Sequence, residues 1–217
     1  MHLTSEEASE VERRVAALEG RTGAEVVAAV VSRSDHYPEI PWTAFALGAS
    51  LAALAVAVRD VAHPTWPSTT GVLLHGAAIL GAGAVLAFAS AVLPAFGRLF
   101  LRASRAEGEV LQQAQGMFLE REVFHTPGRT GVLLLASLFE RRVVLVADTG
   151  LRERIGPEGW KAVVDRMTPS LAAGRTAQGL LEGLGALEEV LVRGGFTGAA
   201  TGAGRALADR PVEEEGT

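Results

Sequence analysis

The apolar residues of this chain are concentrated in two long stretches, Trp42–Val58 and Val72–Pro94. Neither stretch contains Asp, Glu, Lys or Arg. A helix that crosses a bilayer needs about 20 residues of this kind. Only a short polar connector with two prolines, residues 59–70, separates the two stretches. The pattern therefore predicts a two-helix transmembrane hairpin, which returns the chain to the side of the membrane from which it came.

The remaining residues alternate between helical and strand patterns. Thr4 and Glu7 have the spacing of a capping box at the start of a helix. Short apolar runs bounded by turn residues predict strands, and the two strands near residue 140 are so close that they must pair as an antiparallel hairpin. The predicted elements are a helix ending at Gly20, a strand over Gly23–Val31, a long helix over Phe96–Glu122, strands over Gly131–Leu138 and Arg142–Ala147, and helices over Gly156–Met167 and Thr176–Val192.

These elements predict an α/β fold in which a central sheet is flanked by helices, interrupted by the transmembrane hairpin. The three strands are apolar on both faces and should share one sheet that helices cover on each side. We therefore expect residues 1–40 and 96–193 to form one domain around a hairpin at residues 41–95. The tail at 194–217 is rich in Gly and Ala at first and acidic at its end, and we expect it to be flexible.

Charge and composition indicate where the protein is located in the cell and how it is oriented in the membrane. Arg33 precedes the first stretch, and Arg98, Arg102 and Arg105 follow the second, whereas the connector carries only Arg59. The positive-inside rule then predicts an inner-membrane protein that crosses the cell membrane twice with both termini in the cytoplasm. We expect no secretory signal peptide at the charged N-terminus. The net charge of −5 gives no basis for nucleic-acid binding, and the absence of Cys excludes disulfides and thiolate chemistry.

Four segments carry a family resemblance. They are LTSEEASEVERRVAALEGRTGAEVVAAVV, FHTPGRTGVLLLASLFERRVVLVADTG, GPEGWKAVVDRMTPSLAAGRTAQGL and GRALADRPVE. Together they resemble the TPM domain family, named for a thylakoid lumen protein, a photosystem II repair protein and an acetylcholine-receptor modulator. The resemblance implies a compact α/β sandwich. It also implies three kinds of role, because some relatives are weak acid phosphatases, others bind divalent metal through acidic loops, and many serve membrane-protein maintenance.

Four residues are candidates for chemistry. Asp148 ends a strand before Thr149-Gly150, where it either binds a divalent cation (calcium or magnesium) together with Asp35 or caps the following turn. His125 and Arg129 flank a Pro-Gly turn. They act either as acid, base or phosphate clamp, or as a residue that complements a helix dipole and a partner of a carboxylate. Glu140, Arg141 and Arg142 are expected to form an exposed charged turn.

Two functions remain open at this point. The first is a membrane-anchored TPM-like module without catalytic activity, which binds a membrane-protein partner in membrane-protein maintenance. The second is a weak, metal-assisted acid phosphatase. A metal site needs several convergent oxygen ligands, and the acidic residues at strand ends are few, so the sequence favours the binding module with no cofactor. It leaves the oligomeric state open.

Overall fold

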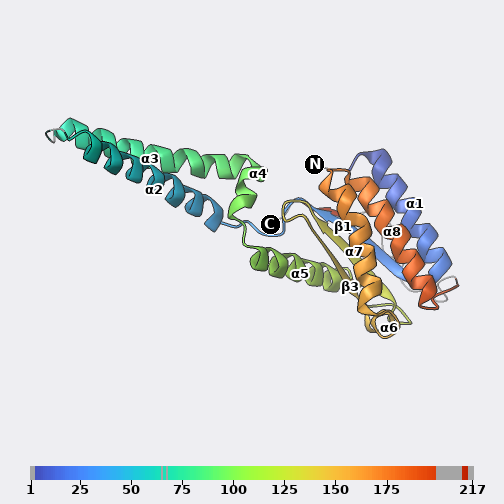
Figure 1. Cartoon of the computed structure of the whole chain (residues 1–217). Helices are drawn as coiled ribbons and strands as arrows, with labels where there is room; N and C mark the ends of the chain where they lie inside the picture. Colours follow the sequence, from blue (N-terminus) through green and yellow to red (C-terminus); the bar gives the residue numbers. More distant parts are fainter. Residues whose placement is uncertain (1–2, 65, 67, 199–211, 215–217) are drawn as a thin grey trace. The chain divides into compact units, whose positions relative to one another are not determined.

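The computed structural model describes residues 3–64, 66, 68–198 and 212–214, and these divide into two compact units (Figure 1). The hairpin unit is His36–Arg105, and the α/β unit is formed by the chain on either side of it. The α/β unit contains α1 (Ser5–Thr22), β1 (Glu25–Val31), α5 (Ala103–Glu120), β2 (Gly131–Ser137), β3 (Arg142–Ala147), α6 (Thr149–Arg152), α7 (Pro157–Ala172), α8 (Thr176–Arg193) and β4 (Val212–Glu214). The hairpin unit contains α2 (Glu39–Ala62), α3 (Thr69–Val92), α4 (Pro94–Gly97) and the 3-10 turn η1 (Arg98–Phe100).

The strands form one mixed sheet in the order β3-β2-β1-β4. β1 runs parallel to β2, with Glu25 opposite Gly131 and Val31 opposite Ser137. β2 and β3 are antiparallel, as expected for so short a connection. β4 pairs in parallel with the last three residues of β1. The prediction that three strands share one sheet is confirmed, although about a hundred residues separate β1 from β2 along the chain.

Helices cover both faces of this sheet, which makes the α/β unit a mixed α/β fold. Alternate strand residues point to opposite faces. One face, which includes Val26, Val132 and Leu134, packs against α1, α7 and α8. The other face, which includes Val27 and Leu133, packs against α5. Figure 1 shows α1, α7 and α8 grouped on one side of the strands and α5 on the other. Each fully buried aliphatic side chain in these layers contributes about 1.5–3 kcal/mol.

The predicted N-terminal helix and its N-cap are confirmed, but the helix does not end at Gly20 as predicted and continues to Thr22. The Thr4 hydroxyl accepts from the Glu7 backbone N–H, and the Glu7 carboxylate accepts from the Thr4 backbone N–H at 2.8 Å. That backbone hydrogen bond, together with the one from the Thr4 hydroxyl, lowers the pKa of Glu7. Gly23 ends the helix in the left-handed conformation at φ 70°, which a residue without Cβ adopts readily. Helix α1 is thus bounded by local sequence signals at both ends.

The prediction of one long helix over Phe96–Glu122 is wrong in its first part. The chain forms α4 and η1, becomes extended at Leu101, and begins α5 only at Ala103. Pro94 disfavours the helical conformation of the residue before it, and Leu93 is accordingly extended at φ −104°, ψ 98°. Gly97 then packs so closely that a Cβ there would lie 2.7 Å from the Ser90 carbonyl oxygen. Apolar spacing carries no sign of this sharp turn.

In the hairpin unit the large apolar side chains are mostly exposed, whereas in the α/β unit they are mostly buried. α2 and α3 have 24 residues each, a length of about 36 Å. They meet along a narrow seam, where a Cβ at Gly48 would lie 2.7 Å from the Ala82 carbonyl oxygen and Gly83 packs against Phe45. Most of their large apolar side chains are exposed. By length and composition, both helices are apolar enough to cross a membrane.

The C-terminal tail lies partly outside the described residues, including most of the GRALADRPVE segment. In its described parts, Phe196 is buried beneath the Arg154 guanidinium, 4.2 Å from the ring centroid. Val212–Glu214 forms β4 at the edge of the sheet.

Candidate functional site

Asp148 forms a tight corner between β3 and α6. Its backbone N–H donates to the Gly131 carbonyl oxygen at 2.9 Å, which continues the ladder with β2. Its Oδ1 accepts from the Thr149 backbone N–H at 2.7 Å and lies 3.3 Å from the Thr149 hydroxyl. The side chain is only 4% exposed. Asp148 therefore serves as the N-cap of the short helix α6.

Arg129 lies against the other carboxylate oxygen of this corner. Its Nε is 3.1 Å from Asp148 Oδ2, in an ion pair whose alignment falls short of a hydrogen bond. The Arg129 carbonyl also accepts from the Gly150 N–H at 3.0 Å. A Cβ at Gly150 would lie 2.3 Å from the Gly128 carbonyl oxygen, so glycine is required there. The loop before β2 and the turn after β3 thus form one interlocked structure that Asp148 holds from within.

His125 lies in the same loop but faces solvent. Its ring stacks on Phe124 with the planes 11° apart and the centroids 6.3 Å apart. Its backbone N–H donates to the Glu122 carbonyl at 2.7 Å in the turn that follows α5. The topology therefore brings His125, Arg129 and Asp148 to one end of the sheet, where Arg129 pairs with Asp148.

Asp35 lies at the opposite end of the sheet. It follows the carboxyl end of β1, where Val31 pairs with Ser137. Asp148 follows the carboxyl end of the antiparallel strand β3, where Ala147 pairs with Val132 at the start of β2. The length of β2 therefore separates the two carboxylates, a distance of about 20 Å at 3.3 Å per residue. The structure does not bring Asp35 and Asp148 into one site.

The residues at the Asp148 corner do not fit a divalent cation. Calcium takes six to eight oxygen ligands, and magnesium demands six in octahedral geometry. Both oxygens of Asp148 already face donors, and the neighbouring Arg129 guanidinium would repel a cation. Over the described ranges, 3–198 without residues 65 and 67 and then 212–214, no group of three or more His, Asp or Glu could hold a metal.

Glu140 is buried, so the prediction of an exposed turn over Glu140–Arg142 is wrong for its first residue. Arg141 is exposed with φ 53°, whereas Glu140 is 8% exposed. Glu140 Oε1 accepts from the Ser34 backbone N–H at 2.9 Å, and Oε2 accepts a short hydrogen bond from the Ser137 hydroxyl. The Ser34 hydroxyl donates to the Ser137 hydroxyl at 2.9 Å. Glu140 therefore joins the exit of β1 to the β2–β3 hairpin.

Sequence reasoning missed this network because a charged hairpin tip is normally solvated. The sequence signal that could have revealed the network is Phe139, which directly precedes Glu140. Phe139 is buried beneath the Arg33 guanidinium, whose Cζ lies 4.0 Å from the ring centroid. An apolar side chain at a hairpin tip indicates that something covers the tip. Each polar atom of the network has a partner, which is the condition for a buried polar cluster to stabilise a fold. The network holds the end of the sheet together.

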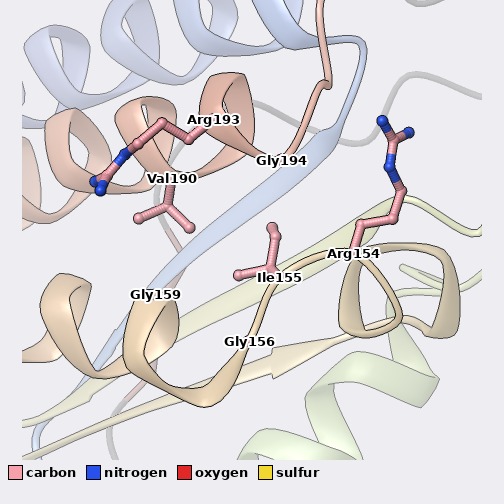
Figure 2. Close-up of a pocket in the computed structure, with 7 residues that line it drawn as sticks. All are labelled: Arg154, Ile155, Gly156, Gly159, Val190, Arg193 and Gly194. Atoms are coloured by element: carbon pink, nitrogen blue, oxygen red, sulfur yellow. The ribbon is translucent and has the colours of Figure 1, made fainter.

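Two hollows lie along the C-terminal half of α8. The first has a volume of about 180 Å³ and is lined by three glycines and four larger residues (Figure 2). Figure 2 shows Ile155 and Val190 pointing toward one another, with the guanidinium groups of Arg154 and Arg193 on opposite sides of them. Arg154 is held by its contact with the Phe196 ring. The hollow is small, with an aliphatic floor and a basic rim.

The second hollow, the α1–α8 groove, has a volume of about 500 Å³. Its lining is Arg14, Arg21, Gly185, Glu188, Glu189, Val192 and Arg193. The buried Glu188 carboxylate bridges two arginines, with Oε2 2.6 Å from Arg14 Nη2 and Oε1 2.6 Å from Arg21 Nη1. Three arginines and two glutamates leave the lining with one net positive charge. Arg193 lines both hollows, so they are neighbours on α8.

The comparisons with known proteins agree with this architecture. The family model described as the TPM domain matches residues 104–190. Among solved structures, the BA42 protein from the psychrophilic bacterium Bizionia argentinensis is similar at a TM-score of 0.57 and 13% identity, over 99% of this chain and 97% of that chain. At this identity the likeness concerns the fold alone. The comparison with curated proteins finds no match. The match to the TPM domain therefore runs from α5 through most of α8, residues 104–190.

Proposed function

We propose that this chain is a membrane-anchored TPM module that binds a membrane-protein partner in membrane-protein maintenance. The hairpin unit crosses the inner membrane twice, and the α/β unit lies in the cytoplasm with both termini. The α/β unit acts by binding rather than by catalysis.

The observation that carries this proposal is the exposed apolar surface of α2 and α3. Large contiguous apolar surfaces on a folded protein mark a contact with membrane or with another protein. Here such side chains occur along the whole of both helices, for example Leu54 on α2 and Leu80 on α3. The helices are about 36 Å long, and the hydrocarbon core of a bilayer is about 30 Å thick. The dimensions therefore suit two membrane crossings.

The α1–α8 groove supports the binding part of the proposal. Its arginines come from two helices that the buried Glu188 holds in place, so the groove is preorganised. The partner segment that this lining suits is extended and acidic, because carboxylates bind arginine through paired hydrogen bonds. Gly185 at the groove leaves room for a backbone to approach, since its Cβ would meet only Arg14 Nη2 at 3.6 Å.

Topology is the first test. A reporter enzyme that works only in the cytoplasm should be active when it is fused after Thr217. Protease added outside intact spheroplasts should cleave the connector at His63–Thr70. A reporter that is exported at Thr217, or a connector that is protected, would contradict the proposed orientation.

Partner binding is tested by site-specific photocrosslinking in membranes. A photoreactive residue at Val192 in the groove should give a crosslink to a membrane protein, and Arg193→Glu should weaken that crosslink. The matched control is a photoreactive residue at Gln112, which is exposed. Gln112 lies on α5, the helix that covers the other face of the sheet. Equal crosslinking from both positions would contradict a specific groove.

The phosphatase alternative finds no support in the described residues, because the Asp148 corner does not fit a divalent cation. Melting curves of wild type and Asp148→Asn with and without calcium or magnesium distinguish the two functions.

A further inference from the structure

We propose that this chain forms a two-fold symmetric dimer through the outer edge of β3, which pairs antiparallel with β3 of a second copy. We call this edge, over Arg142–Ala147, the β3 edge. The inference goes beyond the proposed function, because the dimer needs neither the α1–α8 groove nor insertion into a membrane. Each copy supplies the neighbouring strand that the other lacks.

The two edges of the sheet differ in how the chain covers them. At the β1 edge, the Glu19 carboxylate accepts from the Val26 N–H at 2.7 Å, and β4 pairs with the last three residues of β1. At the other edge, β3 is the last strand, and no strand of the described chain lies beyond it. Proteins commonly protect such an edge with Lys, Pro or a bulge, whereas every residue between Arg142 and Asp148 is aliphatic. The β3 edge is therefore open to another strand.

The side chains of β3 also leave room for a neighbour. All six residues of β3 are half-buried, whereas all of β2 is buried. Val143, Leu145 and Ala147 lie against the layer of α1, α7 and α8. Val144 and Val146 lie against α5 on the other face. The helices thus cover β3 only in part on each face, and an added strand would complete the burial of these aliphatic side chains.

The ladder with β2 determines which backbone groups of β3 point outward. The Asp148 N–H donates to the Gly131 carbonyl, so Asp148 faces β2. Because this direction alternates along a strand, Val143, Leu145 and Ala147 face away from β2. Each of these three residues presents one N–H and one carbonyl. The β3 edge therefore offers a regular row of donors and acceptors.

One antiparallel register pairs this whole row with itself. When Leu145 lies opposite Leu145 of the second copy, Val143 lies opposite Ala147 of that copy, and the reverse holds by symmetry. Directly opposed outward residues exchange both of their hydrogen bonds, so every outward group of both copies finds a partner. A shift by two residues in either direction leaves Val143 or Ala147 without a strand partner. The two-fold register is therefore set by the backbone.

The same register places opposite charges together. Arg142 lies opposite Asp148 of the second copy, and side chains that are directly opposed share one face of the sheet. Arg142 is 36% exposed and lies 3.6 Å from Glu107. The Asp148 Oδ2 is buried and accepts no hydrogen bond within the described residues, although Arg129 lies 3.1 Å away. Symmetry forms the Arg142–Asp148 pair twice, and this charge pairing favours a second copy over an unrelated strand.

The strength of the dimer follows from its size. Six residues a side are fewer than the roughly 20–30 of a standard stable interface. We therefore expect a reversible dimer whose fraction rises with protein concentration.

The absence of Cys from the chain gives a direct test, because an engineered single Cys can form a disulfide only with a second copy. The full chain is oxidised in detergent and in vesicles. In the proposed register, the two Cα atoms of Leu145→Cys lie about 5.5 Å apart, within the range that a disulfide spans. Val143→Cys lies on the same strand face, but its two copies are about 13 Å apart along the strands. We expect at least about fivefold more disulfide-linked dimer from Leu145→Cys than from Val143→Cys.

Further variants test the register and the charges. Val143→Cys/Ala147→Cys should form as much linked dimer as Leu145→Cys, because each Cys then faces one of the second copy. In the Leu145→Cys background, Arg142→Glu places a like charge opposite Asp148 and should lower the yield to that of Val143→Cys, whereas Arg142→Lys should retain most of it. Val143→Pro in that background removes one outward N–H and leaves the ladder with β2 intact, so it should also lower the yield. Melting curves show that each variant is folded.

Three results would overturn the proposal. The first is an equal yield of linked dimer from Leu145→Cys and Val143→Cys, which indicates random collision. The second is an undiminished yield in both Arg142→Glu and Val143→Pro. The third is a disulfide from Leu145→Cys in cells to a different protein in place of a second copy, which would assign the β3 edge to another partner.

Discussion

The α/β unit and the hairpin unit use the same apolar residue types in opposite ways. In the α/β unit, Leu133, Leu134 and Leu135 are fully buried because helices cover both faces of the sheet. In the hairpin unit, Leu73 on α3 is 69% exposed and only the seam around Gly48 and Gly83 is closed. The α/β unit therefore makes its own apolar environment. The hairpin unit requires one from outside, which the proposed bilayer would supply.

The largest expected effect comes from removing a core side chain. Leu134→Ala leaves a cavity between the sheet and its helices, and we expect a loss of about 2–5 kcal/mol in the free energy of unfolding of the α/β unit. The matched variant Leu74→Ala removes the same atoms from the exposed face of α3 and should change that free energy by less than about 0.5 kcal/mol. Denaturant unfolding of the protein in detergent measures both. Similar losses for the two variants would break the comparison.

The next effect concerns glycines at close approaches. A Cβ at Gly131 would lie 1.9 Å from the Val123 carbonyl oxygen, so Gly131→Ala should cost about 3 kcal/mol by overpacking. Gly48→Ala should cost less than Gly131→Ala, because the two helices of the hairpin can separate slightly, whereas β2 is held by neighbours on both sides. Melting temperatures of the two variants in detergent measure which of them is the less stable. The controls are Gly20→Ala and Gly76→Ala, since nothing lies within 4 Å of either Cβ position. A Gly131→Ala protein as stable as the controls would contradict the close approach.

A smaller effect is expected at the Asp148 corner. Asparagine also accepts the capping hydrogen bond from Thr149, and Arg129 is 54% exposed, so Asp148→Asn should cost no more than about 1 kcal/mol. Asp148→Ala removes the cap and should cost about 1 kcal/mol more. Melting curves of wild type and Asp148→Asn with calcium or magnesium should show no shift. A wild-type shift that the Asn variant loses would support the metal-assisted phosphatase, because a ligand stabilises only through its affinity for the native state.

The smallest effect is a titration on the solvated surface of the α/β unit. The hydrogen bond from the Ser170 hydroxyl at 2.7 Å, followed by that from Gln178, lowers the pKa of Glu182. A lowered carboxyl pKa stabilises the fold above the pKa of the unfolded chain, and this contribution disappears as the pH falls through the folded pKa. Ser170→Ala should raise the pKa of Glu182 toward its ordinary value. An NMR titration of the Glu182 side chain measures it, and an unchanged value would show that Ser170 is not the main cause.

Local signals in the sequence predicted several elements correctly. The capping box at Thr4 and Glu7 located the start of α1, and short apolar runs bounded by turn residues located β1, β2 and β3. These signals succeed because they depend on neighbouring residues or on burial of a whole segment. The helix over Phe96–Glu122 failed because apolar spacing does not show how the turn at Leu93 and Pro94 continues. The burial of Glu140 failed because its hydrogen-bond partner Ser34 is 106 residues away.

The sequence by itself determined most helices and three of the strands of the α/β unit, and the unusual length and apolar character of the two hairpin helices. Only the tertiary structure decided which candidate residues meet. The β2–β3 connection is too short to be anything but antiparallel, but nothing local indicates that β1 runs parallel to β2. That one direction places Asp35 and Asp148 at opposite ends of the sheet and leaves Arg129 as the partner of Asp148. The direction of β1 depends on its pairing with β2, about a hundred residues further along the chain, which no window of neighbouring residues contains.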